Sequence, residues 1–262
     1  MRLTLRVLFV LLGWTALRPV QSAFAQTTCA SPGKDGTTFS ASPNTYYPGT
    51  GTAAANATTI SVGAMRTGTG AGTTAIGIND LLLVIQMQGA DINNSNSASY
   101  GSTSNLTAGQ YEYVVAAGPV NNGSIPLTTA LKNTYTASAV GTTATLRTFQ
   151  VVRVPQYSSL TLTANIVPAS WNGSTGGIVA LDVAGAINFT SGNTNYSIDA
   201  SGVGFRGGAG RVLTAANATT NTAYLTTSGS NANAQKGGGI AGTPQYVNNG
   251  GTLVDRGADG YP

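Results

Sequence analysis

Three segments in the middle of the chain carry the apolar patterns of β-strands. Residues 80–87 (DLLLVIQM) form a continuous apolar run between turn signals, as expected of a strand that is buried on both faces. Residues 111–116 (YEYVVA) and residues 147–154 (RTFQVVRV) alternate with a period of two, which is typical of strands. We expect all three to be buried strands of one sheet system.

After Pro155 the apolar segments become short and are separated by Gly or Asn turns. The candidate strands in this part are residues 159–163, 178–183, 186–189 and 196–200. Segments spaced by about 10 to 20 residues suit successive rungs of a parallel β-solenoid, and they also suit the hairpins of a sandwich. We expect rungs that stack beside the sheet. A tight hairpin between residues 178–183 and 186–189 would contradict this detail.

These patterns predict an all-β fold with less than about a tenth of the residues helical. A sandwich-like or barrel-like N-terminal sheet leads into short, solenoid-like rungs, with long polar loops between them. The predicted organisation is a signal peptide (1–25), a turn-rich arm (26–79), a β-sheet region (80–157), a short-strand region (158–204) and a Gly/Asn/Thr-rich segment (205–262).

The first 25 residues have the pattern of a secretory signal peptide. Arg2 and Arg6 are basic, residues 7–17 are apolar, and Ala23 and Ala25 supply the small side chains that signal peptidase accepts. The apolar run of about 11 residues is too short for a membrane span of roughly 20. We therefore expect a secreted or cell-surface protein that begins at Gln26 and has no membrane span in this chain.

Composition removes several classes of function. Three of the 12 basic residues lie in the predicted signal peptide, which leaves nine basic against eight acidic residues. A nearly neutral surface does not attract the phosphates of nucleic acids, so nucleic acid is not an expected partner. Histidine, the commonest general base and zinc ligand, is absent. Cys29 is the only cysteine, so no internal disulfide forms.

Several short phrases extend over most of the chain after the signal peptide. They are residues 29–36, 44–49, 80–88, 109–113, 152–157, 171–173, 176–179, 198–211 and 239–244. Together they resemble the N-terminal region of large, glycine-rich exported proteins of bacteria, which are often followed by Ig-like "conserved repeat" domains. The resemblance implies a surface or secreted location and a glycine-rich region that continues beyond Pro262. It implies no activity and no catalytic residue.

One segment has the oxygen spacing that begins a calcium-binding loop. Asp91, Asn93 and Ser95 follow a D-x-N-x-S pattern, but the glycine at the sixth position and the glutamate at the twelfth are missing. Asparagine-rich turns are common without a metal. We expect no cofactor, with calcium at these three residues as the alternative.

Acidic side chains within strand-like segments are the candidates for carbohydrate chemistry. Glu112, Asp182 and Asp199 have this position, and a lyase would place Arg153 or Arg206 beside such an acid. The structural alternative is that Glu112 and Arg153 form a cross-strand ion pair. Trp171 and the tyrosines provide either core packing or a surface on which sugars stack. The candidate ligand-binding residues are Trp171, Asp182, Asp199 and Arg206.

Two hypotheses for function follow. The first is a non-catalytic surface, adhesion or structural module of a larger bacterial protein, with cell-surface glycans or other surface proteins as partners. The second is a carbohydrate-active β-solenoid domain, either a glycoside hydrolase or a polysaccharide lyase. The absence of histidine favours the first. An open groove that holds Asp182 or Asp199 beside an arginine and an aromatic ring would favour the second.

Overall fold

The computed structural model describes residues 31–93, 98–99, 102–138, 147–205, 239, 246–249 and 252–255. All the regular elements in these residues are strands, so the predicted all-β class is confirmed for them. Within this part of the chain, no helix is long and apolar enough to cross a membrane. The predicted signal peptide, Cys29, Ser95 and Arg206 lie outside the described residues.

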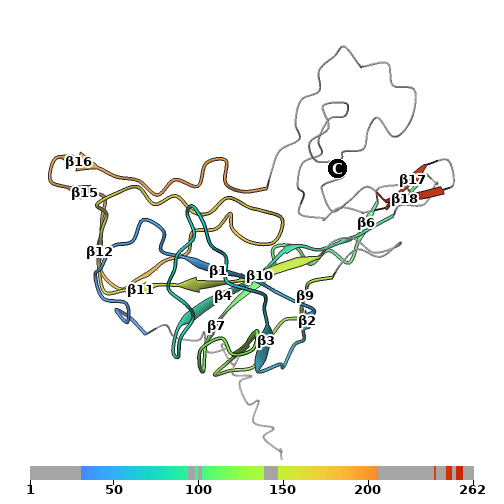
Figure 1. Cartoon of the computed structure of the whole chain (residues 1–262), viewed down its shortest axis with the longest axis horizontal. Coiled ribbons are helices and arrows are strands. Elements are labelled where there is room, and N and C mark those ends of the chain that lie inside the picture. Colours follow the sequence, from blue (N-terminus) through green and yellow to red (C-terminus); the bar gives the residue numbers. More distant parts are fainter. Residues whose placement is uncertain are drawn as a thin grey trace, which may run out of the picture.

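The centre of the fold is a four-stranded antiparallel sheet (Figure 1). Its order is β1 (Thr45–Pro48), β10 (Thr148–Val154), β4 (Leu81–Gln88) and β7 (Tyr111–Val115). The three strands predicted from the central apolar segments are therefore neighbours in one sheet. Strand β10 is buried at every residue, as expected of a strand between two others.

Both faces of this sheet are covered, because alternate side chains of β4 enter two different hydrophobic clusters. Leu82 and Val84 pack in the first cluster, whereas Leu81 and Leu83 pack in the second. The first cluster is closed by four short strands: β2 (Thr52–Ala53) paired with β9 (Tyr135–Thr136), and β3 (Thr59–Ser61) paired with β8 (Ser124–Pro126). The continuous apolar run of β4 thus reflects burial on both faces.

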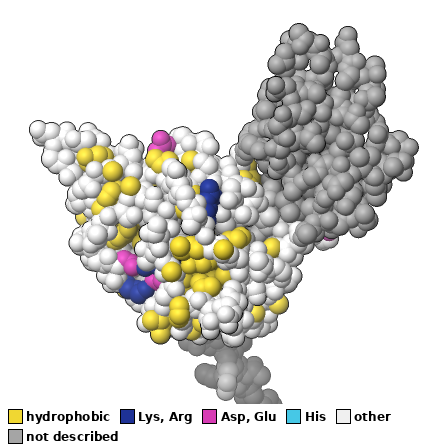
Figure 2. All heavy atoms as spheres, in the orientation of Figure 1, with side chains coloured by type: hydrophobic (Ala, Val, Ile, Leu, Met, Phe, Trp, Pro, Cys, Tyr) yellow, Lys and Arg dark blue, Asp and Glu magenta, His cyan; other side chains and the backbone are white. Residues whose placement is uncertain are grey.

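Strand β7 is only partly buried, which corrects the prediction for this strand. The side chains of Tyr111 and Tyr113 are 58% and 45% exposed, and their rings contact each other edge to face at 6.1 Å between centroids. Strand β7 lies at an edge of the sheet, so its outward tyrosines have cover from one side only. Figure 2 shows hydrophobic side chains exposed near the middle of this view of the described residues.

Beyond β10 the chain makes short parallel pairs in place of long antiparallel strands. Strand β11 (Gln156–Tyr157) pairs with β13 (Asp182–Val183), and β12 (Leu160–Thr161) pairs with β14 (Ile187–Asn188). A parallel bridge joins Ile166 to Ile198. These pairs enclose a third hydrophobic cluster that includes Leu160 and Ile166.

Residues 178–183 and 186–189 do not form a hairpin with each other, since each pairs in parallel with an earlier strand. The strands are shorter than predicted, and Ile198 is the one residue of the segment 196–200 with a bridge. No sheet closes within the described residues. The sandwich, barrel and solenoid details therefore stay predictions.

The part expected to be a turn-rich arm supplies β1 to the central sheet, which the sequence pattern did not predict. Asn44, directly before β1, is 1% exposed and connects the two halves of the fold. Its amide group donates to the carbonyl oxygens of Arg153 (3.0 Å) and Ala180 (2.6 Å) and accepts from the Ala180 N–H (3.0 Å). The other described strands are β5 (Asp91–Ile92), β6 (Thr103–Ser104), β15 (Thr190–Ser191), β16 (Thr194–Asn195), β17 (Tyr246–Asn249) and β18 (Thr252–Asp255).

Candidate functional site

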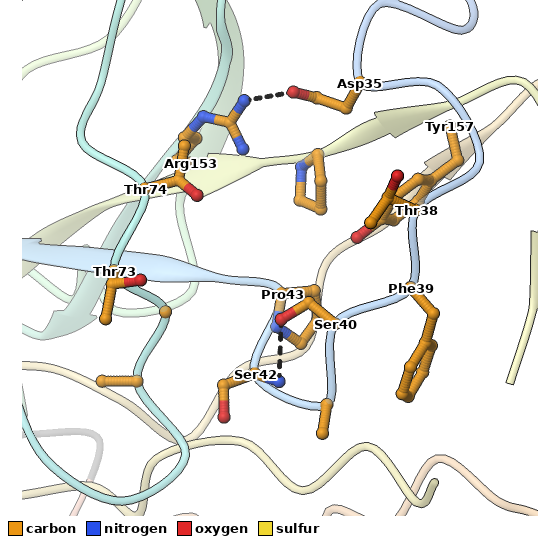
Figure 3. A pocket seen from close by; sticks show the side chains of 14 residues that line it. Asp35, Thr38, Phe39, Ser40, Ser42, Pro43, Thr73, Thr74, Arg153 and Tyr157 are labelled. Atoms are coloured by element: carbon orange, nitrogen blue, oxygen red, sulfur yellow. Dashed lines mark hydrogen bonds and ion pairs between the residues drawn. The ribbon is translucent and has the colours of Figure 1, made fainter. Parts of the chain in front are cut away.

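An open groove of about 560 Å³ lies where the central sheet meets the short-strand region (Figure 3). Its volume is in the range of small-molecule sites. Two loops, residues 38–43 and 71–74, form walls, and Arg153, Pro155 and Tyr157 come from the end of β10 and from β11. The hydroxyl side chains of the walls are Thr38, Ser40, Ser42, Thr73 and Thr74.

Close contact between the two wall loops depends on Gly72. Its N–H donates to the carbonyl oxygen of Asn44 at 2.7 Å. A Cβ at this position would lie 2.8 Å from the carbonyl oxygen of Ser42, which is closer than side chains normally approach. A larger residue would therefore separate the two walls.

Beneath the groove, two cations and two carboxylates form a buried ionic cluster. The Arg153 side chain is 6% exposed, and its Nε donates to Asp80 at 2.9 Å. Its Nη2 forms an ion pair with Asp35, as Figure 3 shows, and the Lys34 ammonium pairs with Asp80. The four charges cancel, so the cluster presents no net charge to the groove.

These contacts keep the cluster ionised. Burial by itself raises the pKa of Asp80, but hydrogen bonds from Arg153, Lys34 and the Gly77 amide outweigh it and leave that pKa below its ordinary value. Burial also disfavours the charged form of Arg153, yet Asp80 and Asp35 raise its pKa above the ordinary value. Breaking one pair would leave a buried charge without compensation.

Asp35 also fixes the N-terminal segment against β11. Its second carboxylate oxygen accepts the N–H of Gln156 at 2.7 Å, and Gly36 forms a parallel bridge with Tyr157. The Tyr157 side chain is itself buried, with 4% exposed. Burial, followed by the charge of Asp35, raises the pKa of Tyr157, so that its hydroxyl stays neutral.

The predicted ligand-binding residues lie elsewhere. Asp182 is half-buried in β13, 3.4 Å from the Gln156 side-chain amide, and Asp199 is exposed and accepts the Ser201 N–H at 2.9 Å. The Trp171 ring packs edge to face on Phe205, with 5.5 Å between centroids. None of these three lines the groove.

The calcium candidates do not present a free carboxylate. One oxygen of Asp91 accepts from Arg147 at 2.5 Å, and the other accepts from the Asn105 amide at 2.6 Å. The backbone N–H of Asn93 donates to Ser102 at 2.8 Å. Across the described residues, no group of three or more His, Cys, Asp or Glu side chains is placed to hold a metal ion.

The alternative of a Glu112–Arg153 ion pair is wrong. Glu112 lies on β7 opposite Val84, whereas Arg153 lies on β10 opposite Leu82, so that strand β4 separates them. Glu112 accepts the backbone N–H groups of Lys132 (2.9 Å) and Asn133 (3.0 Å) instead. Two strands that do not adjoin cannot form a cross-strand pair.

Sequence reasoning identified Arg153 but missed its partners. A charged residue inside an otherwise apolar strand needs a partner, and that signal is present in residues 147–154. Asp80, at the start of the buried β4, gives the same signal. Nothing in the sequence indicated that Lys34 and Asp35 approach from more than 100 residues before Arg153.

Comparisons of the chain with protein-family models, with curated proteins and with solved structures give no match.

Proposed function

We propose that this chain is a non-catalytic module of an exported bacterial surface protein and that it binds glycans in the groove. The observation that carries the proposal is the lining of the groove. Hydroxyl side chains and aromatic rings surround an open site of about 560 Å³ whose charges are paired beneath it.

The chemistry of this lining suits a sugar. Five Ser and Thr hydroxyls both donate and accept hydrogen bonds, as sugar hydroxyls do. The aromatic rings of Phe39 and Tyr157 provide apolar surface for the C–H groups of a pyranose ring. Because the groove is open, it admits part of a longer chain as well as a free sugar.

Binding without turnover is supported by the state of the one acid in the groove. A glycosidase needs two carboxyl groups that flank the bond to be cleaved, one of them able to transfer a proton. Asp35 is the only Asp or Glu in the lining, and both of its oxygens accept hydrogen bonds from Arg153 and Gln156. The carbohydrate-active alternative is the competing outcome of the experiment below.

The exported location rests on the signal-peptide pattern and on the family resemblance. We also propose that the short parallel pairs begin a solenoid-like part. The partner of Gln156 is 26 residues later in the chain, and the partner of Leu160 is 27 residues later. Nearly constant offsets are typical of stacked rungs.

The test is a screen of the chain from residue 26 onwards against soluble polysaccharides, with binding measured by calorimetry and products by chromatography. We expect binding without product release, and weaker binding in Phe39→Ala. Phe189→Ala, an exposed aromatic residue away from the groove, is the matched control. Product release that Asp35→Asn, Asp182→Asn or Asp199→Asn abolishes would establish the carbohydrate-active alternative. No binding to any polysaccharide would contradict the proposal.

A further inference from the structure

We infer that the groove selects an uncharged sugar over a uronic acid, and that Arg153 and Tyr157 are the residues that determine this specificity. The inference rests on the proposed glycan-binding function. It follows from which polar atoms are still available in the groove and from the charge that surrounds them.

Arg153 presents one unused donor. Its Nε and Nη2 are taken by Asp80 and Asp35, whereas its Nη1 has no acceptor among the described residues. The one side-chain nitrogen or oxygen buried there without a hydrogen-bond partner is the hydroxyl of Tyr135. The Nη1 group therefore reaches solvent, although 94% of its side chain is buried. Since Arg153 lines the groove, this atom is available to a ligand.

Tyr157 presents a second available group. Its hydroxyl likewise has no partner among the described residues and is not among the fully buried atoms, while the residue as a whole is 4% exposed. Figure 3 shows Tyr157 beside Thr38 in the groove. The ring is held by β11, which pairs with β13, so the hydroxyl is fixed in place before a ligand arrives.

The surrounding charge disfavours an anion. A carboxylate bound to Nη1 would share the guanidinium with Asp35, whose carboxylate occupies the adjacent Nη2. Two like charges on one cation repel each other, and Arg153 and Lys34 are already neutralised by Asp35 and Asp80. A hydroxyl, a ring oxygen or an acetamido carbonyl accepts the same hydrogen bond without adding a charge.

The test uses glucan, mannan and galactan hexasaccharides, each as the neutral sugar and as its C6-oxidised uronate. Calorimetry with the chain from residue 26 onwards should show at least about tenfold tighter binding of the neutral member of one pair. Tyr157→Phe should weaken that binding by about three- to tenfold. Arg153→Lys, which keeps the charge and loses the fork of donors, should also weaken it.

Tyr46→Phe is the control, because Tyr46 is equally buried but donates to the Ile178 carbonyl at 2.7 Å, outside the groove. Circular dichroism and thermal unfolding of each variant report whether it folds, and Tyr157→Phe decides the result if Arg153→Lys does not. Equal or tighter binding of the uronate, or neutral binding that Tyr157→Phe leaves unchanged, would overturn this inference alone. Failure of all six sugars and of the polysaccharide screen would overturn the glycan-binding function itself.

Discussion

The central sheet and the short-strand region are built from the same kinds of residue but are held together differently. In the sheet, strands of up to eight residues pair antiparallel and bury side chains on both faces. In the region from β11 to β16, strands of two residues pair, and side chains such as Ile187 (36% exposed) and Phe189 (45% exposed) face solvent. Stability is therefore expected to concentrate in the sheet.

The groove lies at the junction of these two regions, and this position has a physical advantage. Arg153 and its partners belong to the rigid sheet, whereas Tyr157 begins the short-strand region. A binding site is more precise when its polar groups are fixed by packed elements. The loops that carry the hydroxyl groups have room to vary without affecting the core.

The ionic cluster gives the largest expected effect on stability. Arg153→Met removes the partner of two carboxylates, one of them the 3% exposed Asp80, and should lower the free energy of unfolding by about 3 to 5 kcal/mol. Urea unfolding followed by circular dichroism measures this change. A loss below about 1 kcal/mol would show that the cluster is not buried as described.

Truncation of one leucine and one isoleucine compares the two regions directly. Leu82→Ala, at a fully buried position of β4, should cost about 2 to 5 kcal/mol. Ile187→Ala, at a partly exposed position of β14, should cost less than about 1 kcal/mol. The two variants are measured by the same urea unfolding. Equal losses would mean that the short-strand region is as tightly packed as the sheet.

The same contrast explains how much of the fold could be predicted from the sequence. Strands β4, β7 and β10 were predicted within about one residue because long apolar or alternating patterns specify strands. Strand β1 was missed, because its sequence TYYP lies among turn signals and its burial depends on pairing with β10. The lengths of β13 and β14 were overestimated for the same reason, since a short strand depends on its neighbour.

The candidate site was predicted less well than the fold. The cluster joins Lys34 and Asp35 to Asp80 and Arg153, residues that are far apart in the chain. Acids in strand-like segments attracted attention to Asp182 and Asp199, but the pattern does not show which segment faces which groove. The burial of Arg153 was the signal that pointed to the site.

Asn44 provides a test of how the two regions are joined. Asn44→Ala removes hydrogen bonds to Arg153 and to both backbone groups of Ala180, and it leaves buried polar groups without partners. We expect a loss of about 1 to 3 kcal/mol. Hydrogen exchange should show faster exchange at the amide of Ala180 than at the amides of β4. Unchanged exchange at Ala180 would contradict this role.

The dependence of stability on pH should show the smallest effect and should separate Asp80 from the other acids. The pKa of Asp80 is lowered from its ordinary value of 3.8, so the unfolded chain binds this proton more readily than the folded chain. The stabilisation is therefore complete above that value and is lost as pH falls through the lower folded pKa. Urea unfolding between pH 2 and pH 7 measures this loss.

Two variants separate the contribution of Asp80 from that of acids in general. Asp80→Asn should lower stability at pH 7 and reduce the further loss at acid pH, because the group that titrates is gone. Asp182→Asn, a half-buried acid of β13, should keep the acid-dependent loss of the original chain. The chain contains no histidine, so no imidazole titrates between pH 5 and pH 8 to obscure the comparison. An identical acid response in both variants would show that Asp80 contributes nothing to it, and the ionic cluster would then not be what holds the sheet to the N-terminal segment.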